Sequence, residues 1–226
     1  MKRGICIIII VISICGRANG TPSTQIWNPS TDIQSNGSLH FGIDDYFSPV
    51  WPEDGGYSFP TDIGLTYGLL PGLEVGLDSL MPSSAPIVFN AKYGVPEKGN
   101  IPAYAVGGFG FGTDHDKTDL NVAYGLVART TEIGRISVGY YSGNERLLIN
   151  PENGNKDNTG FILTWDKAMT DRLWLCIDYA SGYSSLGAAF YGFSWAFAQN
   201  TSVIFSYGTY NNGAKPTVTT QLDINI

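Results

Sequence analysis

Charged residues are scarce in this chain. Asp, Glu, Lys and Arg make up 15% of its 226 residues, against about 25% in an average soluble domain. This is too little charge to cover a conventional water-facing surface. The balance is acidic, with 20 Asp and Glu against 13 Lys and Arg, which argues against a nucleic-acid partner because phosphates require a clustered basic face. Hydrophobic residues reach 43% and include 13 Tyr, 11 Phe and 5 Trp, which argues against disorder.

Long apolar runs are almost absent. The run from Ile5 to Cys15 follows Lys2 and Arg3 and precedes the small residues of Ala18-Asn19-Gly20, which is the pattern of a cleaved signal peptide. The run is too short for a membrane helix, which needs about 20 residues. We therefore expect a signal peptide over 1–20 and a mature chain that starts at Thr21.

Cysteine is also rare, with three residues in the whole sequence. Two of them fall in the expected signal peptide. A lipoprotein signal that ends at Cys15 is the rival interpretation, but the bulky Ile14 stands where a small residue is required. Only Cys176 remains, which excludes an internal disulfide framework and a multi-cysteine metal site. We expect Cys176 to pack as a small buried residue.

The abundant feature is alternation. Apolar residues alternate with small or polar residues in segment after segment, which is the period of a β-strand with two unlike faces. In 191–197, for example, Tyr191, Phe193, Trp195 and Phe197 alternate with Gly192, Ser194 and Ala196. The pattern predicts twelve strands, at 39–47, 62–69, 73–78, 87–93, 101–112, 120–126, 135–140, 161–166, 173–179, 191–197, 203–208 and 218–226, and the register of 101–112 stays ambiguous because of its glycines.

The predicted connections alternate between short and long. Short links such as Pro71-Gly72 and Gln199-Asn200 are followed by longer, more polar ones such as 48–60 and 142–158. An even number of alternating strands with short turns on one rim and long loops on the other is typical of bacterial outer-membrane barrels. From residue 39 to 226 the chain resembles this class, in a small, porin-like, twelve-stranded form. The expected fold is all-β, a closed antiparallel up-and-down transmembrane β-barrel.

The resemblance implies a Gram-negative outer-membrane location with both termini periplasmic. The partners of the protein would be outer-membrane lipid and lipopolysaccharide, together with the barrel-assembly machinery, which recognises the last strand. Ile226 ends that strand where the class most often has an aromatic residue. Residues 21–38 show little alternation and are expected to form an N-terminal periplasmic segment or a plug. A soluble sandwich or lipocalin-like barrel is the alternative fold, but its outer face would have to be polar or charged. Here the non-apolar face is mostly Gly, Ser, Thr, Ala and Asn.

The face opposite the apolar one is expected to line the lumen. It carries both signs of charge with an excess of acids, so a conducting path would favour cations. We predict a small porin or channel for passive passage of small solutes. In the competing interpretation, the charged side chains of this face pair with one another across the interior and plug it. A non-conducting scaffold that presents loops for partner binding or adhesion is the alternative function. The predicted pore-lining residues are His40, Asp44, Glu74, Asp78, Lys92, Arg129, Arg135, Asp166, Asp178 and Asp223.

The aromatic residues of the apolar face suit the bilayer. Amphipathic rings near strand ends form girdles at the headgroup level, and this is the role expected of Tyr67, Tyr93, Tyr124, Tyr140, Trp165, Tyr179 and Tyr207. The richest lipid-facing stripe, which could also support an oligomer, comprises Tyr191, Phe193, Trp195, Phe197, Phe205 and Tyr207.

The sequence gives little support to an enzymatic function. The chain has two histidines, His40 and His115, and neither adjoins a serine motif that would supply a nucleophile. A barrel lipid-modifying enzyme is therefore a remote alternative. The loop that contains Asp114, His115, Asp116 and Asp119 could attract a divalent cation, but a solvated acidic loop is the expected interpretation. No catalytic residue, metal or cofactor is predicted.

Overall fold

The computed structural model describes residues 22–226, and the expected signal peptide lies outside this range. The regular secondary structure of the described chain is β, apart from the three-residue 3-10 helix η1 (Pro52–Asp54). The strands are β1 (Leu39–Phe47), β2 (Thr61–Leu70), β3 (Leu73–Met81), β4 (Ile87–Val95), β5 (Ala103–Gly112), β6 (Asp119–Thr131), β7 (Gly134–Ser142), β8 (Thr159–Ala168), β9 (Leu173–Ala180), β10 (Ala188–Ala198), β11 (Thr201–Tyr210) and β12 (Thr217–Asn225). Within residues 22–226, no helix is long and apolar enough to cross a membrane.

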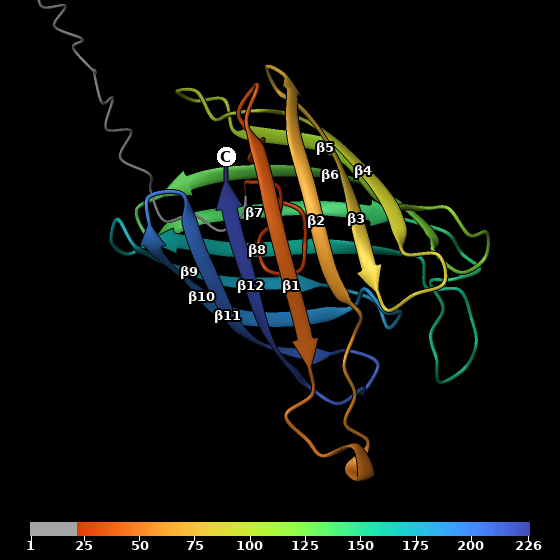
Figure 1. The fold of residues 1–226 in the computed structure, drawn as a ribbon. Helices are drawn as coiled ribbons and strands as arrows, with labels where there is room; N and C mark the ends of the chain where they lie inside the picture. The colour runs from red at the N-terminus through yellow and green to blue at the C-terminus, as the bar shows by residue number, and fades with distance from the viewer. Residues whose placement is uncertain (1–21) are drawn as a thin grey trace, which may run out of the picture.

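Each strand pairs antiparallel with its neighbours in sequence, and β1 pairs with β12 to close the cylinder (Figure 1). Closure gives every strand two partners, so no edge is left with unpaired backbone groups. The prediction of a closed, twelve-stranded, up-and-down antiparallel barrel is confirmed.

The two rims of the barrel differ. The turn rim holds the links 71–72, 96–102, 132–133, 169–172 and 199–200, three of which are two residues long. The loop rim holds 48–60, 82–86, 113–118, 143–158, 181–187 and 211–216. At 71–72 the tight turn requires a positive φ of 81° at Gly72, a conformation that glycine adopts without steric cost. Both ends of the barrel sequence, Leu39 and Asn225, lie at the turn rim.

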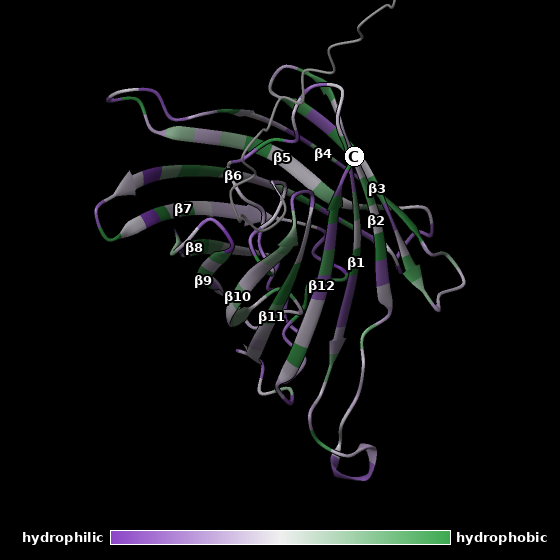
Figure 2. Ribbon diagram, turned by 60° about the vertical axis from the view of Figure 1, so that its left-hand side comes forward, coloured by the Kyte–Doolittle hydropathy of each residue, from purple (hydrophilic) through white to green (hydrophobic). Residues whose placement is uncertain are grey.

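Alternation places large apolar side chains outside and smaller or polar ones inside. On β10, Tyr191, Phe193 and Trp195 are exposed, whereas the intervening Ser194 is fully buried. Figure 2 shows the same effect as changing bands of hydropathy along the strands. The six residues of the predicted lipid-facing stripe are each 41–55% exposed.

The prediction for β6 is wrong in its choice of face. Val122, Tyr124 and Leu126 point inward and pack in one buried cluster with Tyr141 and Ile162. Tyr124 therefore belongs to the interior and to no lipid-facing girdle. Periodicity defines two faces but not which of them is inside, because an apolar face suits lipid and a packed interior equally. The small residues of β6 face outward instead.

The position of Arg129 also differs from the prediction, because the inner and outer faces of β6 are exchanged. It lies on the exposed face of β6, where it donates a hydrogen bond to the carbonyl oxygen of Gly99 (2.8 Å) and forms an ion pair with Glu97 (3.1 Å). The backbone N–H of Thr130 also donates to Glu97 and lowers the pKa of that carboxyl. The prediction that Arg129 lines the pore is therefore wrong, and its partners belong to the 96–102 link on the turn rim.

Candidate functional site in the lumen

Residues 22–38, called the luminal segment below, run inside the barrel (red in Figure 1). Their principal anchor is Asp178 on the inner face of β9. One carboxylate oxygen accepts hydrogen bonds from the backbone N–H groups of Ile26 (3.1 Å), Trp27 (2.8 Å) and Asn28 (2.9 Å), and the other accepts from Asn28 Nδ2 (2.6 Å). Asp178 is 0% exposed. A buried carboxylate requires such a set of donors to offset its desolvation.

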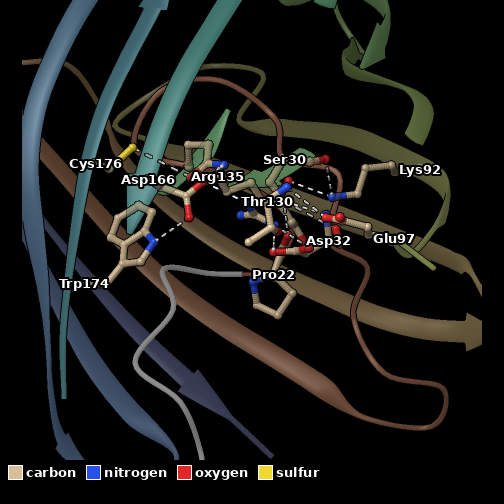
Figure 3. A network of polar contacts seen from close by, with 12 residues as sticks. Pro22, Ser30, Asp32, Lys92, Glu97, Thr130, Arg135, Asp166, Trp174 and Cys176 are labelled. Atoms are coloured by element: carbon tan, nitrogen blue, oxygen red, sulfur yellow. Dashed lines mark hydrogen bonds and ion pairs between the residues drawn. The ribbon is translucent and has the colours of Figure 1, made fainter. Parts of the chain in front are cut away.

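A second anchor joins the segment to β7 and β8. The guanidinium of Arg135 contacts both carboxylate oxygens of Asp32 and donates from Nε to Asp166 (2.9 Å). Asp166 also accepts hydrogen bonds from Trp174 Nε1 (3.1 Å) and Gln25 Nε2 (3.2 Å). Figure 3 shows Asp166 between Arg135 and Trp174, with Cys176 nearby. The segment and the wall therefore share one continuous polar network.

A third anchor lies on β3 and β4. Lys92 Nζ forms an ion pair with Glu74 (3.2 Å) and donates to the carbonyl oxygens of Ser23 (2.8 Å) and Ser30 (3.3 Å). Glu74 in turn accepts a hydrogen bond from the backbone N–H of Gln34 (2.6 Å). Both charged side chains are almost completely buried. The luminal segment therefore satisfies charges on two separate regions of the wall.

A fourth anchor of the luminal segment is an aromatic cluster around Trp27. Trp27 stacks on Phe190 with ring centroids 5.0 Å apart and makes edge contacts with Tyr46 and Tyr210. Its indole N–H donates to the carbonyl oxygen of Leu186. The segment therefore also packs against aromatic side chains from the inner faces of β1, β10 and β11.

A cavity of about 470 Å³ remains beside the segment. Its wall comes mainly from the inner faces of β1 to β5, and Trp27 and neighbouring residues of the segment close its other side. Among the residues that line it are Asp44, Asp62, Asp78, Tyr46, Phe59 and Tyr124. The cavity therefore combines carboxylates with aromatic rings.

The luminal acids fall into two groups. Glu74, Asp166 and Asp178 are bound to the segment or to basic side chains, as described above. Asp223 accepts a hydrogen bond from Ser202 (3.4 Å) and lies 3.5 Å from His40 Nε2. The second group, called the acidic wall below, consists of Asp44, Asp62 and Asp78, and none of the three has an ion pair with a basic side chain among the residues that the structure describes.

Sequence reasoning assigned nine of these luminal positions correctly to the inner face, namely His40, Asp44, Glu74, Asp78, Lys92, Arg135, Asp166, Asp178 and Asp223. Their role as pore lining stays a prediction. Asp62 was missed, although it alternates with Ile63 and therefore shares the inner face of Gly64 and Thr66. In the structure it is the direct cross-strand partner of Asp44.

The acidic loop at 113–118 is tied to its neighbour. Side-chain atoms of His115, Asp116 and Asp119 lie within 4.8 Å of one another. Arg146, from the 143–158 loop, forms an ion pair with Asp116 (2.8 Å) and contacts His115 Nε2 (3.2 Å). A guanidinium therefore already supplies the positive charge at this cluster, and the contact joins two loops of the loop rim.

A closed cylinder with an apolar exterior and a charged interior defines a transmembrane β-barrel, here of the small porin-like type. Among solved structures, the fold is similar to the KdgM porin, with a TM-score of 0.56, 9% identity, and 82% of this chain and 97% of that chain covered. It is also similar to the NanC porin, with a TM-score of 0.52, 7% identity, and coverage of 82% and 98%. At this identity the likeness shows a shared fold alone. No protein-family model and no curated protein matches the sequence.

Proposed function

We propose that this protein is an outer-membrane channel for the passive passage of small solutes. The observation that carries the proposal is the cavity between the luminal segment and the inner faces of β1 to β5. The segment narrows the lumen on one side, and the acidic wall lines the space on the other. The porin fold supports this function. The barrel exterior would contact lipid and lipopolysaccharide, and the barrel-assembly machinery would recognise β12.

We further propose that the path favours cations. The acidic wall has no basic partner in the described chain, whereas the two lysines that line the cavity, Lys92 and Lys117, pair with Glu74 and Asp114. A cleft lined by one sign of charge concentrates the opposite ion.

Reversal potentials in a salt gradient test the selectivity. With KCl near 0.1 M, where screening acts over about 10 Å, the reversal potential is expected to have the sign of K⁺ preference. At 1 M, where screening acts over about 3 Å, the preference should shrink. An anion preference at low salt, or an equal permeability of both ions, would contradict the proposed role of the acidic wall.

The orientation gives a separate prediction. With both termini periplasmic, the loop rim faces the outside of the cell. An epitope tag inserted between Asn153 and Gly154, in an exposed part of the 143–158 loop, should be stained by antibody on intact cells. The same tag between Pro71 and Gly72 should be stained only after the outer membrane is opened. Staining of the 71–72 tag on intact cells would reverse the orientation.

A further inference from the structure

The three carboxylates of the acidic wall lie on adjacent strands. Asp44 and Asp62 are direct partners across β1 and β2, a relation that places Cβ atoms about 4.5–5.5 Å apart. Asp78 on β3 is paired with Gly64, and a Cβ atom added to Gly64 would lie 2.9 Å from Asp78 Oδ1. The Asp78 carboxylate therefore extends over the glycine toward the other two. Like charges at this separation repel each other, and a cation placed among them would offset that repulsion.

Within the described chain, the acidic wall has few donors of its own. Asn90 Nδ2 donates to Asp78 (2.8 Å). Asp62 Oδ1 is buried and has no hydrogen-bond partner. Thr66, on the same inner face of β2, also lines the cavity and is 7% exposed. Buried polar atoms are normally paired, so the unpaired Asp62 Oδ1, together with the three carboxylates that lack a basic partner, favours a ligand that brings both hydrogen-bond donors and positive charge.

The rest of the cavity is suited to the apolar part of an organic ligand. Gly42 and Gly64 form part of the cavity wall beside the carboxylates, and the absence of a side chain at Gly64 makes room for the Asp78 carboxylate. Tyr46 lies two residues beyond Asp44 on the same inner face, and its ring packs edge-on against Phe59 at 6.1 Å. Aromatic rings attract cations through their faces and also receive apolar groups. A small inorganic ion would use only the carboxylates, whereas an organic ammonium would use both surfaces.

We propose that the acidic wall and the adjoining aromatic rings form a binding site for small organic cations, with an ammonium group at Asp44, Asp62 and Asp78 and an apolar body against Tyr46 and Phe59. This inference rests on the proposed channel function, because it names the class of solute that the path selects. Anions of the same size would meet uncompensated repulsion. Neutral analogues would leave the carboxylates without a counter-charge.

Three probes that share a phenyl body separate these cases: 2-phenylethylammonium, 2-phenylethanol and 3-phenylpropionate. Calorimetric titration of the refolded full barrel in detergent measures binding, and a vesicle flux assay measures passage. The ammonium probe is expected to bind at least about tenfold more tightly than the alcohol, and the carboxylate probe should not bind detectably. Equal binding of ammonium and alcohol would overturn the inference.

The decisive variant is Asp44→Asn, Asp62→Asn, Asp78→Asn. It should lose the preference for the ammonium probe. A control with the same change of net charge is Glu53→Gln, Asp54→Asn, Glu152→Gln, because these three residues are exposed in loops of the loop rim, and it should keep the preference. Heat-modifiable migration in gels verifies folding of both proteins. If the triple variant does not fold, Asp44→Asn with Asp78→Asn replaces it and should weaken the preference.

The outcomes distinguish the two proposals. Ammonium binding without passage of any probe would support the site and contradict the channel. Passage of all three probes at similar rates without selective binding would support the channel and overturn the site. Retention of ammonium preference after neutralisation of the acidic wall would also overturn the site, since the binding carboxylates would then lie elsewhere.

Discussion

Replacement of Phe193 by Arg is expected to lower the free energy of unfolding of the barrel by about 2–4 kcal/mol, the cost of a cation at the lipid face near the midplane. Phe193 lies in the middle of β10, is 41% exposed and faces Phe205 at a ring-centroid distance of 5.6 Å. In a bilayer this exposed surface is in contact with hydrocarbon, where a guanidinium has no partner. A urea titration of refolding into lipid vesicles measures the change.

Asp78→Arg is the matched substitution on the inner wall. It introduces the same guanidinium, but beside Asp44 and Asp62, so its cost should be much smaller. Ser194, the inward neighbour of Phe193, is unsuitable as a control because it is fully buried and paired with Trp174. A larger loss of stability for Asp78→Arg than for Phe193→Arg would show that the inner and outer faces are assigned the wrong way round.

Asp178→Ala should release the luminal segment and increase the conductance of the channel. The substitution removes the acceptor of three backbone N–H groups and one side-chain amide, and each buried donor without a partner costs about 1–3 kcal/mol. The barrel wall itself keeps its strand pairing. Single-channel recordings in planar bilayers should show larger and noisier current steps than the wild type.

Asp44→Ala is the control for this experiment. Asp44 also faces the lumen but has no hydrogen bond to the luminal segment among the described contacts. This variant should weaken cation preference and leave the step size close to the wild-type value. Unchanged conductance in Asp178→Ala, with folding verified, would contradict the view that the segment narrows the path.

The barrel could be predicted from sequence because two of its properties are local. Alternation along 191–197 specifies a strand with unlike faces, and the two-residue link 199–200 specifies an antiparallel neighbour. The choice of inner face is not local. On β10, Tyr191, Phe193 and Trp195 face outward, whereas on β6 Tyr124 and Leu126 fill the interior. The sequence of each strand alone is compatible with both arrangements.

The division of the luminal acids could not be predicted for a different reason. Asp178 and Asp44 have the same sequence context, an acid on the polar face of a strand. Asp178 is satisfied by backbone N–H groups of residues about 150 positions away, and backbone donors leave no signal in the residue types. Asp62, by contrast, could have been recognised from its position in the alternation of β2.

Planar-bilayer recording of the purified, refolded wild-type protein tests the central claim most directly. Refolding is verified beforehand by heat-modifiable migration, so that an absence of current cannot come from unfolded protein. The channel proposal predicts discrete, reproducible current steps that are smaller than those of Asp178→Ala. Folded barrels that insert but give no steps in the wild type or in Asp178→Ala would contradict it, and would favour a non-conducting scaffold that presents the 48–60 and 143–158 loops to a partner.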